Sequence, residues 1–173
     1  QPTGGTMNVS HYFYYDAQQR VCRAYTPEGG ATRYQYDAAG QVVAYAKGQS
    51  NSGCGAIGSV SQKVSQTYDG LGRPTHTNFT DSATPDITRT YDDNGNVLTV
   101  DRNGVDWTYA YNDLNLLTSE TLDIDGLSFA FSYLYNASGH RTRKRFPSNR
   151  YTHFSPDGLG RATGSSYGST QNV

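Results

Sequence analysis

The side chains that could perform chemistry in this 173-residue chain are scattered, and their spacing favours structural roles. Two acidic stretches, 92–96 and 101–106, are similar to calcium loops, but neither continues to the glutamate that completes such a loop. No Gly-x-Ser-x-Gly nucleophile elbow occurs. The histidines lack the spacing of metal ligands, because they lie in separate parts of the chain: His11, His76, His140 and His153. We therefore expect no catalytic residue, no metal site and no cofactor.

One dense basic run, 140–145, could contact phosphate or an acidic partner. On a regular strand, Arg141, Arg143 and Arg145 would share one face and Lys144 would lie on the other. The formal net charge of the whole chain is only −1. We therefore favour a solvated or lumen-facing stripe over a nucleic-acid site.

Two cysteines, Cys22 and Cys54, are too few for a disulfide framework. Cys54 lies in a connection, 47–61, that is rich in glycine and serine. Pairing would require this connection to fold back over about two strands. The sequence leaves open whether the two cysteines pair.

A short phrase, Tyr-Asp-x-x-Gly followed by Arg, Asn or Gln, recurs along the chain. Clear copies begin at 36, 68 and 91, weaker copies begin at 15, 111 and 135, and the last has Pro156 in the tyrosine place. A recurrence at this spacing indicates a repeat architecture, in which no unit can bury its apolar face alone. The residues that define the repeat are Tyr15, Asp16, Tyr36, Asp37, Gly40, Tyr68, Asp69, Gly72, Arg73, Tyr91, Asp92, Gly95, Tyr111, Asn112, Tyr135, Asn136, Gly139, Asp157, Gly160 and Arg161.

The phrase is typical of the tip of a β-hairpin. Aspartate is favoured at the first corner of a turn, and glycine tolerates the positive φ that closes it. Flanking residues alternate as in strands: Phe129, Phe131, Tyr133 and Tyr135 fall on every second position. Between the phrases lie other turn signals, at 26–29, 103–104, 123–126 and 147–149, and two longer connections, at 47–61 and 80–86.

These signals together predict an all-β protein, an antiparallel meander of repeated β-hairpins that forms a curved sheet of about a dozen strands. Aliphatic residues are sparse, but 15 tyrosines supply large rings whose hydroxyl groups can stay in water. A thin sheet rich in tyrosine is therefore expected, and disorder is not. Its two unpaired edges predict self-association if the chain is isolated.

The phrase, with an aromatic residue two places before the tyrosine, resembles the signature of the RHS (rearrangement hotspot) or YD-repeat family over about 11–161. The family includes bacterial polymorphic toxins, insecticidal toxin complexes and teneurins. The resemblance implies a segment of a shell that encloses a C-terminal toxin domain, exported by a bacterial apparatus such as a type VI secretion system. Implied partners are the remaining shell repeats and the enclosed domain, without nucleic acid or a membrane span.

The alternative interpretation is a cell-surface adhesion or carbohydrate-binding protein, with a glycan as its partner. Either interpretation places the protein outside the cell or on its surface. The family's self-cleavage motif and a toxin domain are not found, so we expect no enzyme here. We expect a lead segment at 1–10, about seven repeats at 11–161 with a longer loop at 47–61, and a tail or truncated next repeat at 162–173.

Overall fold

The computed structural model describes residues 10–49, 53–58 and 62–168. All regular elements in these ranges are β-strands, and none of the described residues lies in a helix long and apolar enough to span a membrane. The chain forms two compact units, Gln1–Asp86 and Ile87–Val173. The all-β antiparallel meander predicted from the sequence is confirmed within each unit.

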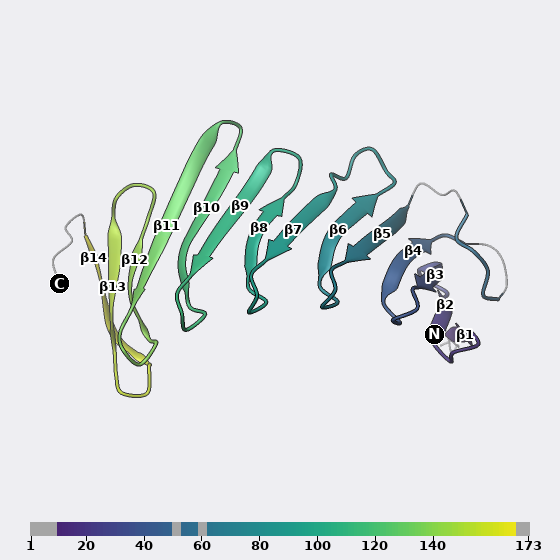
Figure 1. Cartoon of the computed structure of the whole chain (residues 1–173), viewed down its shortest axis with the longest axis horizontal. Helices are drawn as coiled ribbons and strands as arrows, with labels where there is room; N and C mark the ends of the chain where they lie inside the picture. Colours follow the sequence, from purple (N-terminus) through teal and green to yellow (C-terminus); the bar gives the residue numbers. More distant parts are fainter. Residues whose placement is uncertain (1–9, 50–52, 59–61, 169–173) are drawn as a thin grey trace, which may run out of the picture. The chain divides into compact units, whose positions relative to one another are not determined.

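Six strands lie among the described residues of the first unit, each paired antiparallel with the next along the chain (Figure 1). They are β1 (Tyr12–Tyr15), β2 (Val21–Thr26), β3 (Gly30–Tyr36), β4 (Val42–Lys47), β5 (Lys63–Tyr68) and β6 (Pro74–Phe79). Few apolar residues of this unit are buried among those described, and most of them are small: Cys22, Ala31, Ala44, Ala46 and Ile57.

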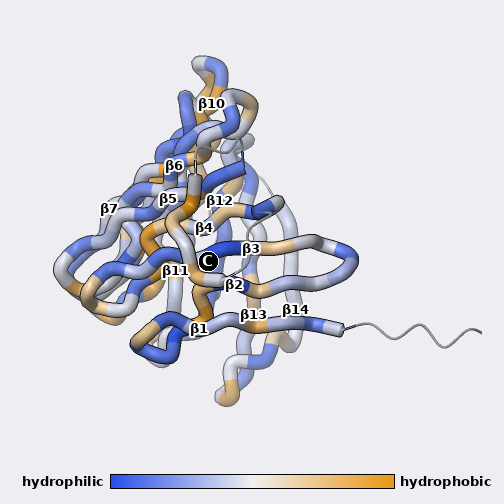
Figure 2. The backbone as a smooth tube through the Cα atoms, turned by 90° about the vertical axis from the view of Figure 1, so that its right-hand side faces the viewer, coloured by the Kyte–Doolittle hydropathy of each residue, from blue (hydrophilic) through white to orange (hydrophobic). Residues whose placement is uncertain are grey.

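In the described part of the second unit, residues 87–168, eight strands follow the same consecutive arrangement. They are β7 (Ile87–Tyr91), β8 (Val97–Asp101), β9 (Val105–Tyr111), β10 (Leu117–Ile124), β11 (Leu127–Tyr135), β12 (Arg141–Arg145), β13 (Tyr151–Pro156) and β14 (Ala162–Gly168). Hydrophobic and hydrophilic residues follow one another within single strands (Figure 2). The strands therefore have two faces of different character, as the sequence alternation predicts.

We call the first residue of each Tyr-Asp phrase its lead position, and the tyrosine there the lead tyrosine. A β-bulge interrupts the ladder of backbone hydrogen bonds at each lead position. Tyr36 pairs with Val42, whereas Gln35 pairs with Ala44, so one residue of β4 has no partner of its own. The same shift occurs at the other lead positions, which are 15, 68, 91, 111, 135 and, with proline, 156. Because each bulge adds one residue, the alternation of faces shifts by one after every turn.

Candidate functional site

The Tyr-Asp phrase folds into one closed turn, and Asp69 shows its geometry. One carboxylate oxygen, Oδ1, accepts hydrogen bonds from the backbone N–H groups of Leu71 and Arg73 at 2.9 and 3.0 Å. The other oxygen, Oδ2, accepts from Nε of Arg73 at 2.6 Å. The backbone closes the same loop, since the Gly72 N–H donates to the Asp69 carbonyl oxygen. The spacing in the phrase thus follows from hydrogen bonds within five residues.

Every other copy uses this arrangement with local variations. Asp16 and Asp157 repeat the arginine pair with Arg20 and Arg161, and Asp92 accepts instead from the side-chain amide of Asn96. Where asparagine replaces the aspartate, at 112 and 136, its side-chain oxygen accepts the same backbone hydrogen bond. The hydrogen bonds from backbone N–H groups and from the arginine side chain lower the pKa of Asp16, Asp69 and Asp157 below the ordinary aspartate value.

Residues in the glycine place have positive φ. The values are 85° at Gly40, 80° at Gly72 and 91° at Gly95, as the turn pattern predicts. Where the phrase lacks glycine, Gln19 and Asn115 adopt φ values of 60° and 59°.

Three lead tyrosines connect their repeat to the preceding one. The hydroxyl group of Tyr36 donates to the Val21 carbonyl oxygen at 2.8 Å, and that of Tyr68 donates to Val42 at 2.7 Å. In the second unit, Tyr135 donates to Leu117 in the same way, at 2.7 Å. Each acceptor is the first residue of the strand that follows the previous turn. We call these hydrogen bonds the tyrosine latches; sequence reasoning did not find them.

Neighbouring turns also contact one another along the rim. The guanidinium group of Arg20 donates to the Asp37 carbonyl oxygen at 3.1 Å, from one repeat to the next. In the second unit, the Asn96 side chain donates to Asn115 at 2.8 Å. The residue after the glycine place therefore has two roles, because it closes its own turn and reaches the next one.

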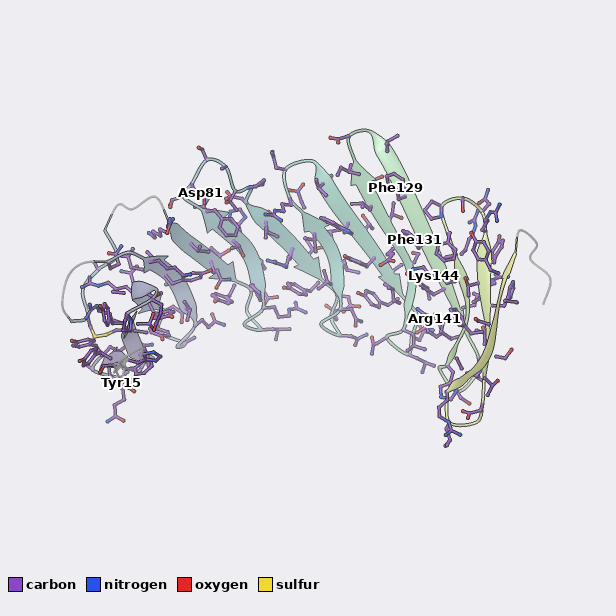
Figure 3. The ribbon with its side chains drawn as sticks, turned by 180° about the vertical axis from the view of Figure 1, so that it is seen from behind. Tyr15, Asp81, Phe129, Phe131, Arg141 and Lys144 are labelled. Carbon is purple, nitrogen blue, oxygen red and sulfur yellow. A yellow bond between two sulfur atoms is a disulfide. The ribbon has the colours of Figure 1, made fainter. Side chains whose placement is uncertain are left out.

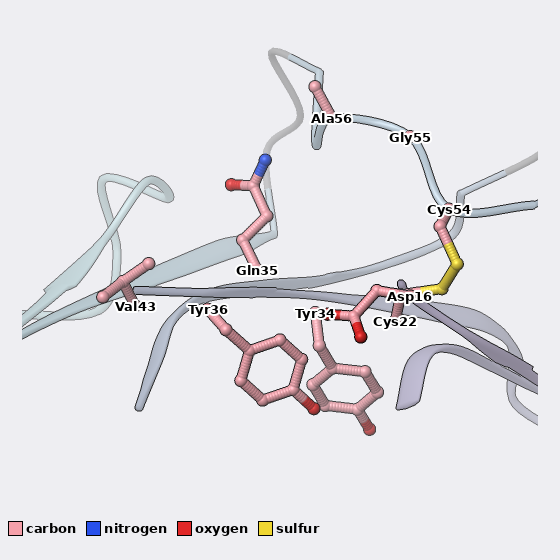
Figure 4. Close-up of a pocket in the computed structure, with 9 residues that line it drawn as sticks. All are labelled: Asp16, Cys22, Tyr34, Gln35, Tyr36, Val43, Cys54, Gly55 and Ala56. Carbon is pink, nitrogen blue, oxygen red and sulfur yellow. A yellow bond between two sulfur atoms is a disulfide. The ribbon is translucent and has the colours of Figure 1, made fainter. Parts of the chain in front are cut away.

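A disulfide joins Cys22 to Cys54. The sequence alone had left open whether these two cysteines pair. It fixes residues 53–57, which we call the strap, on the face of β3 that Gln35 occupies and opposite Tyr34 and Tyr36 (Figure 4). The cavity at this place measures about 440 Å³.

Two further contacts hold the strap. The guanidinium group of Arg33, a residue only 3% exposed, donates to the carbonyl oxygens of Ala56 and Gly53 at 3.1 and 3.2 Å. Ile57 packs with Ala44 and Ala46. The strap therefore covers the small side chains of β4. Without this cover, the first unit would bury little apolar surface.

The predicted alternation of the basic run holds for Arg143, Lys144 and Arg145 but is wrong for Arg141. The bulge at Tyr135 pairs it with Arg141, while Tyr133 pairs with Lys144. Arg141 therefore shares the face of Lys144, and both cations lie over the Tyr133 ring, at 5.7 and 5.4 Å from its centroid. Arg143 lies on the other face, over Tyr151 at 5.1 Å.

Three carboxylates lie side by side on the face opposite the aromatic rings of β11. Asp106 of β9 pairs with Asp101 of β8 and with Asp123 of β10. A hydrogen bond that the protonated Asp106 carboxyl donates to the neighbouring Asp101 side chain, partial burial and the two negative charges raise the pKa of Asp106 above its ordinary value. No group of three metal-ligating side chains with suitable geometry occurs among the described residues.

The RHS repeat family model matches residues 15–50 and 91–133. These two ranges therefore match RHS repeats, as the resemblance predicted, and they fold into the β-hairpins described above. No curated protein sequence matches the chain.

Several solved structures share its fold, among them two with a TM-score of 0.50. One is the Tc holotoxin pore of Photorhabdus luminescens, 17% identical over 91% of this chain, with a TM-score of 0.50. The other is the TcdB2–TccC3 crystal structure without the hypervariable C-terminal region, 17% identical over 94% of this chain, also with a TM-score of 0.50. This chain spans about a tenth of the length of either matched chain, since it covers 10% of each.

Proposed function

We propose that this chain is a wall segment of an RHS-type shell that encloses a C-terminal effector domain of a secreted toxin. The tyrosine latches are the observation that carries the proposal. They join a hairpin to its predecessor at Tyr36, Tyr68 and Tyr135, and so reinforce the backbone ladders that make the repeats of each unit into a continuous sheet. Such a construction provides surface rather than an active site.

Two further observations support the proposal. The same fold occurs in chains of a Tc toxin, of which this chain spans about a tenth. The Cys22–Cys54 disulfide suits an oxidising environment, as expected of an exported protein. A container acts by excluding proteases and the cytosol from its contents and requires no turnover of its own.

The experiment uses the complete reading frame that contains this chain. Tyr133 is 6% exposed, and its hydroxyl group donates to Glu120 at 2.5 Å. Tyr133→Ser removes a buried ring, which should destabilise the wall by about 2–4 kcal/mol. We expect the enclosed domain to become protease-sensitive in the variant while its intrinsic toxicity, measured on the isolated domain, is unchanged.

Asp125→Ala, in the turn between β10 and β11, is the control, and protection should persist in it. Asn51, in the longer connection at 47–61, is another candidate rim position and lies outside the described residues. If Tyr133→Ser retains full protection while Asp125→Ala abolishes a saturable glycan or receptor interaction, the adhesion alternative replaces the container.

A further inference from the structure

We propose that the face of the second unit formed by β11, β12 and the rings beside them is a docking surface for an acidic polypeptide that carries apolar side chains next to its carboxylates. We call this surface the cation–aromatic face; it contains Phe129, Phe131, Tyr133, Arg141, Lys144, Phe146 and Tyr167. The inference rests on the proposed function in one respect, namely that a wall has a polypeptide on one side.

The cations of this face are positioned by rings and not by carboxylates. Nζ of Lys144 lies 4.6 Å from the ring centroid of Phe131 and 5.3 Å from that of Phe146. The guanidinium group of Arg141 lies 4.9 Å from the centroid of Phe154. Neither cation forms an ion pair within the described part of the chain. A ring orients a cation and attracts it without cancelling its charge, so both remain available to an anion.

Exposed rings continue the surface beyond the cations. Phe146 packs edge-on against Phe131 and against Tyr167, with both centroid distances at 6.1 Å. Tyr167 is 61% exposed and Phe129 is 38% exposed. Figure 3 shows Phe129, Phe131, Lys144 and Arg141 following one another across this face. Contiguous exposed apolar surface of this kind indicates an interaction site.

The mixture of charges and rings favours a polypeptide over a nucleic acid. A phosphate backbone requires a row of cations, usually in a strongly basic protein, whereas this chain has a net charge of −1. The face also contains a carboxylate, because Glu120 pairs with Phe131 across the strands and binds the Tyr133 hydroxyl. A segment with aspartate or glutamate next to apolar residues complements both the cations and the rings.

The test measures binding of the full chain to a labelled random copolymer of glutamate and tyrosine, by fluorescence anisotropy. We expect saturable binding that weakens as salt is raised. The double variant Arg141→Gln with Lys144→Gln should weaken binding about tenfold or more, since it removes both available cations. Arg102→Gln is the matched control: it removes the same type of charge from the turn between β8 and β9 and should leave binding unchanged.

Lys144→Arg separates loss of charge from loss of folding, because it keeps the cation over the rings and should bind within about twofold of the parent chain. Polyglutamate, which lacks rings, should bind more weakly than the copolymer. The proposal is overturned if the copolymer does not bind, if Arg102→Gln weakens binding as much as the double variant, or if single-stranded DNA or heparin binds more tightly. Failure here with intact cargo protection in the complete protein would reject this inference and leave the container function standing.

Discussion

At the scale of single residues, the Tyr-Asp phrase is a set of hydrogen-bonding requirements. The aspartate or asparagine must accept from two backbone N–H groups, and the glycine place must adopt positive φ. These demands explain why asparagine replaces aspartate at 112 and 136 without a change of turn. They also explain the stability of the turn independently of any ligand.

Glycine substitutions test the turn geometry. Gly72→Val should lower the free energy of unfolding by about 1–2 kcal/mol through left-handed strain. The new side chain would also meet the Gln41 amide nitrogen, which lies 2.7 Å from the point that a Cβ atom would occupy at Gly72. Gly70→Ala, two residues earlier and without positive φ, is the control and should be neutral or slightly stabilising. Urea unfolding measures both, and equal losses in the two variants would contradict the assignment.

Asp106 predicts an unusual pH dependence. Because the folded state raises the pKa of this carboxyl group, folding favours its protonated form. The contribution of Asp106 to stability should therefore rise as the pH falls through the raised pKa of the folded state. The rise ends where Asp106 of the unfolded chain also becomes protonated, near the ordinary aspartate pKa of about 3.9. Asp106→Asn should raise the melting temperature at neutral pH and remove this gain on acidification.

Asp69→Asn should change the stability at neutral pH in the direction opposite to Asp106→Asn. The folded state lowers the pKa of Asp69. Its carboxylate therefore stabilises the fold at every pH above the ordinary aspartate pKa, and this stabilisation is lost as the pH falls through the lowered pKa. The variant should be less stable at neutral pH, since it loses the pair with Arg73. Thermal melts between about pH 3 and 8 compare the two variants; a destabilised Asp106→Asn protein at neutral pH would refute the repulsion between the three carboxylates.

At the scale of elements, the tyrosine latches at Tyr36, Tyr68 and Tyr135 each bind a repeat to the previous one. Tyr68→Phe keeps the ring and leaves the Val42 carbonyl oxygen without its donor, which should destabilise the first unit by about 1 kcal/mol. Tyr12→Phe, at a ring that is 54% exposed in β1, should have little effect. Denaturant midpoints of the two variants distinguish a latch from general loss of a hydroxyl group.

The strap predicts a response to reduction. The disulfide closes a loop between residues 32 apart in sequence, so Cys54→Ser should lower stability by about 2–4 kcal/mol. A dithiol reductant should have the same effect on the parent chain and none on the variant. Limited proteolysis should then cut near the strap first, because Arg33 and Ile57 alone would hold it. An unchanged denaturation midpoint after verified reduction would argue against a structural role for the bridge.

At the scale of the whole molecule, strand edges set the behaviour of the isolated chain. Among the described residues, β1 and β14 each pair with a single strand, and Phe13 of β1 is 53% exposed. Their free backbone groups should pair with other copies and produce concentration-dependent dimers or larger species. Phe13→Lys should reduce this association. Sedimentation as a monomer throughout the micromolar range would contradict the prediction.

The amino-acid sequence by itself determined the class of fold, the positions of the turns and the RHS resemblance. These features depend on interactions within a few residues: the cap of Asp69 reaches only Arg73, and the alternation in β11 needs no distant partner. Local interactions leave a pattern that can be read along the chain.

Only the tertiary structure decided which distant residues meet. The bulge at Tyr135 moved Arg141 to the face of Lys144, because one unpaired residue shifts the alternation in a strand. The pairing of Cys22 with Cys54 and the latch from Tyr68 to Val42 join residues 32 and 26 positions apart. Such contacts depend on register and on the path of a loop across neighbouring strands, and neither is specified by spacing along the sequence.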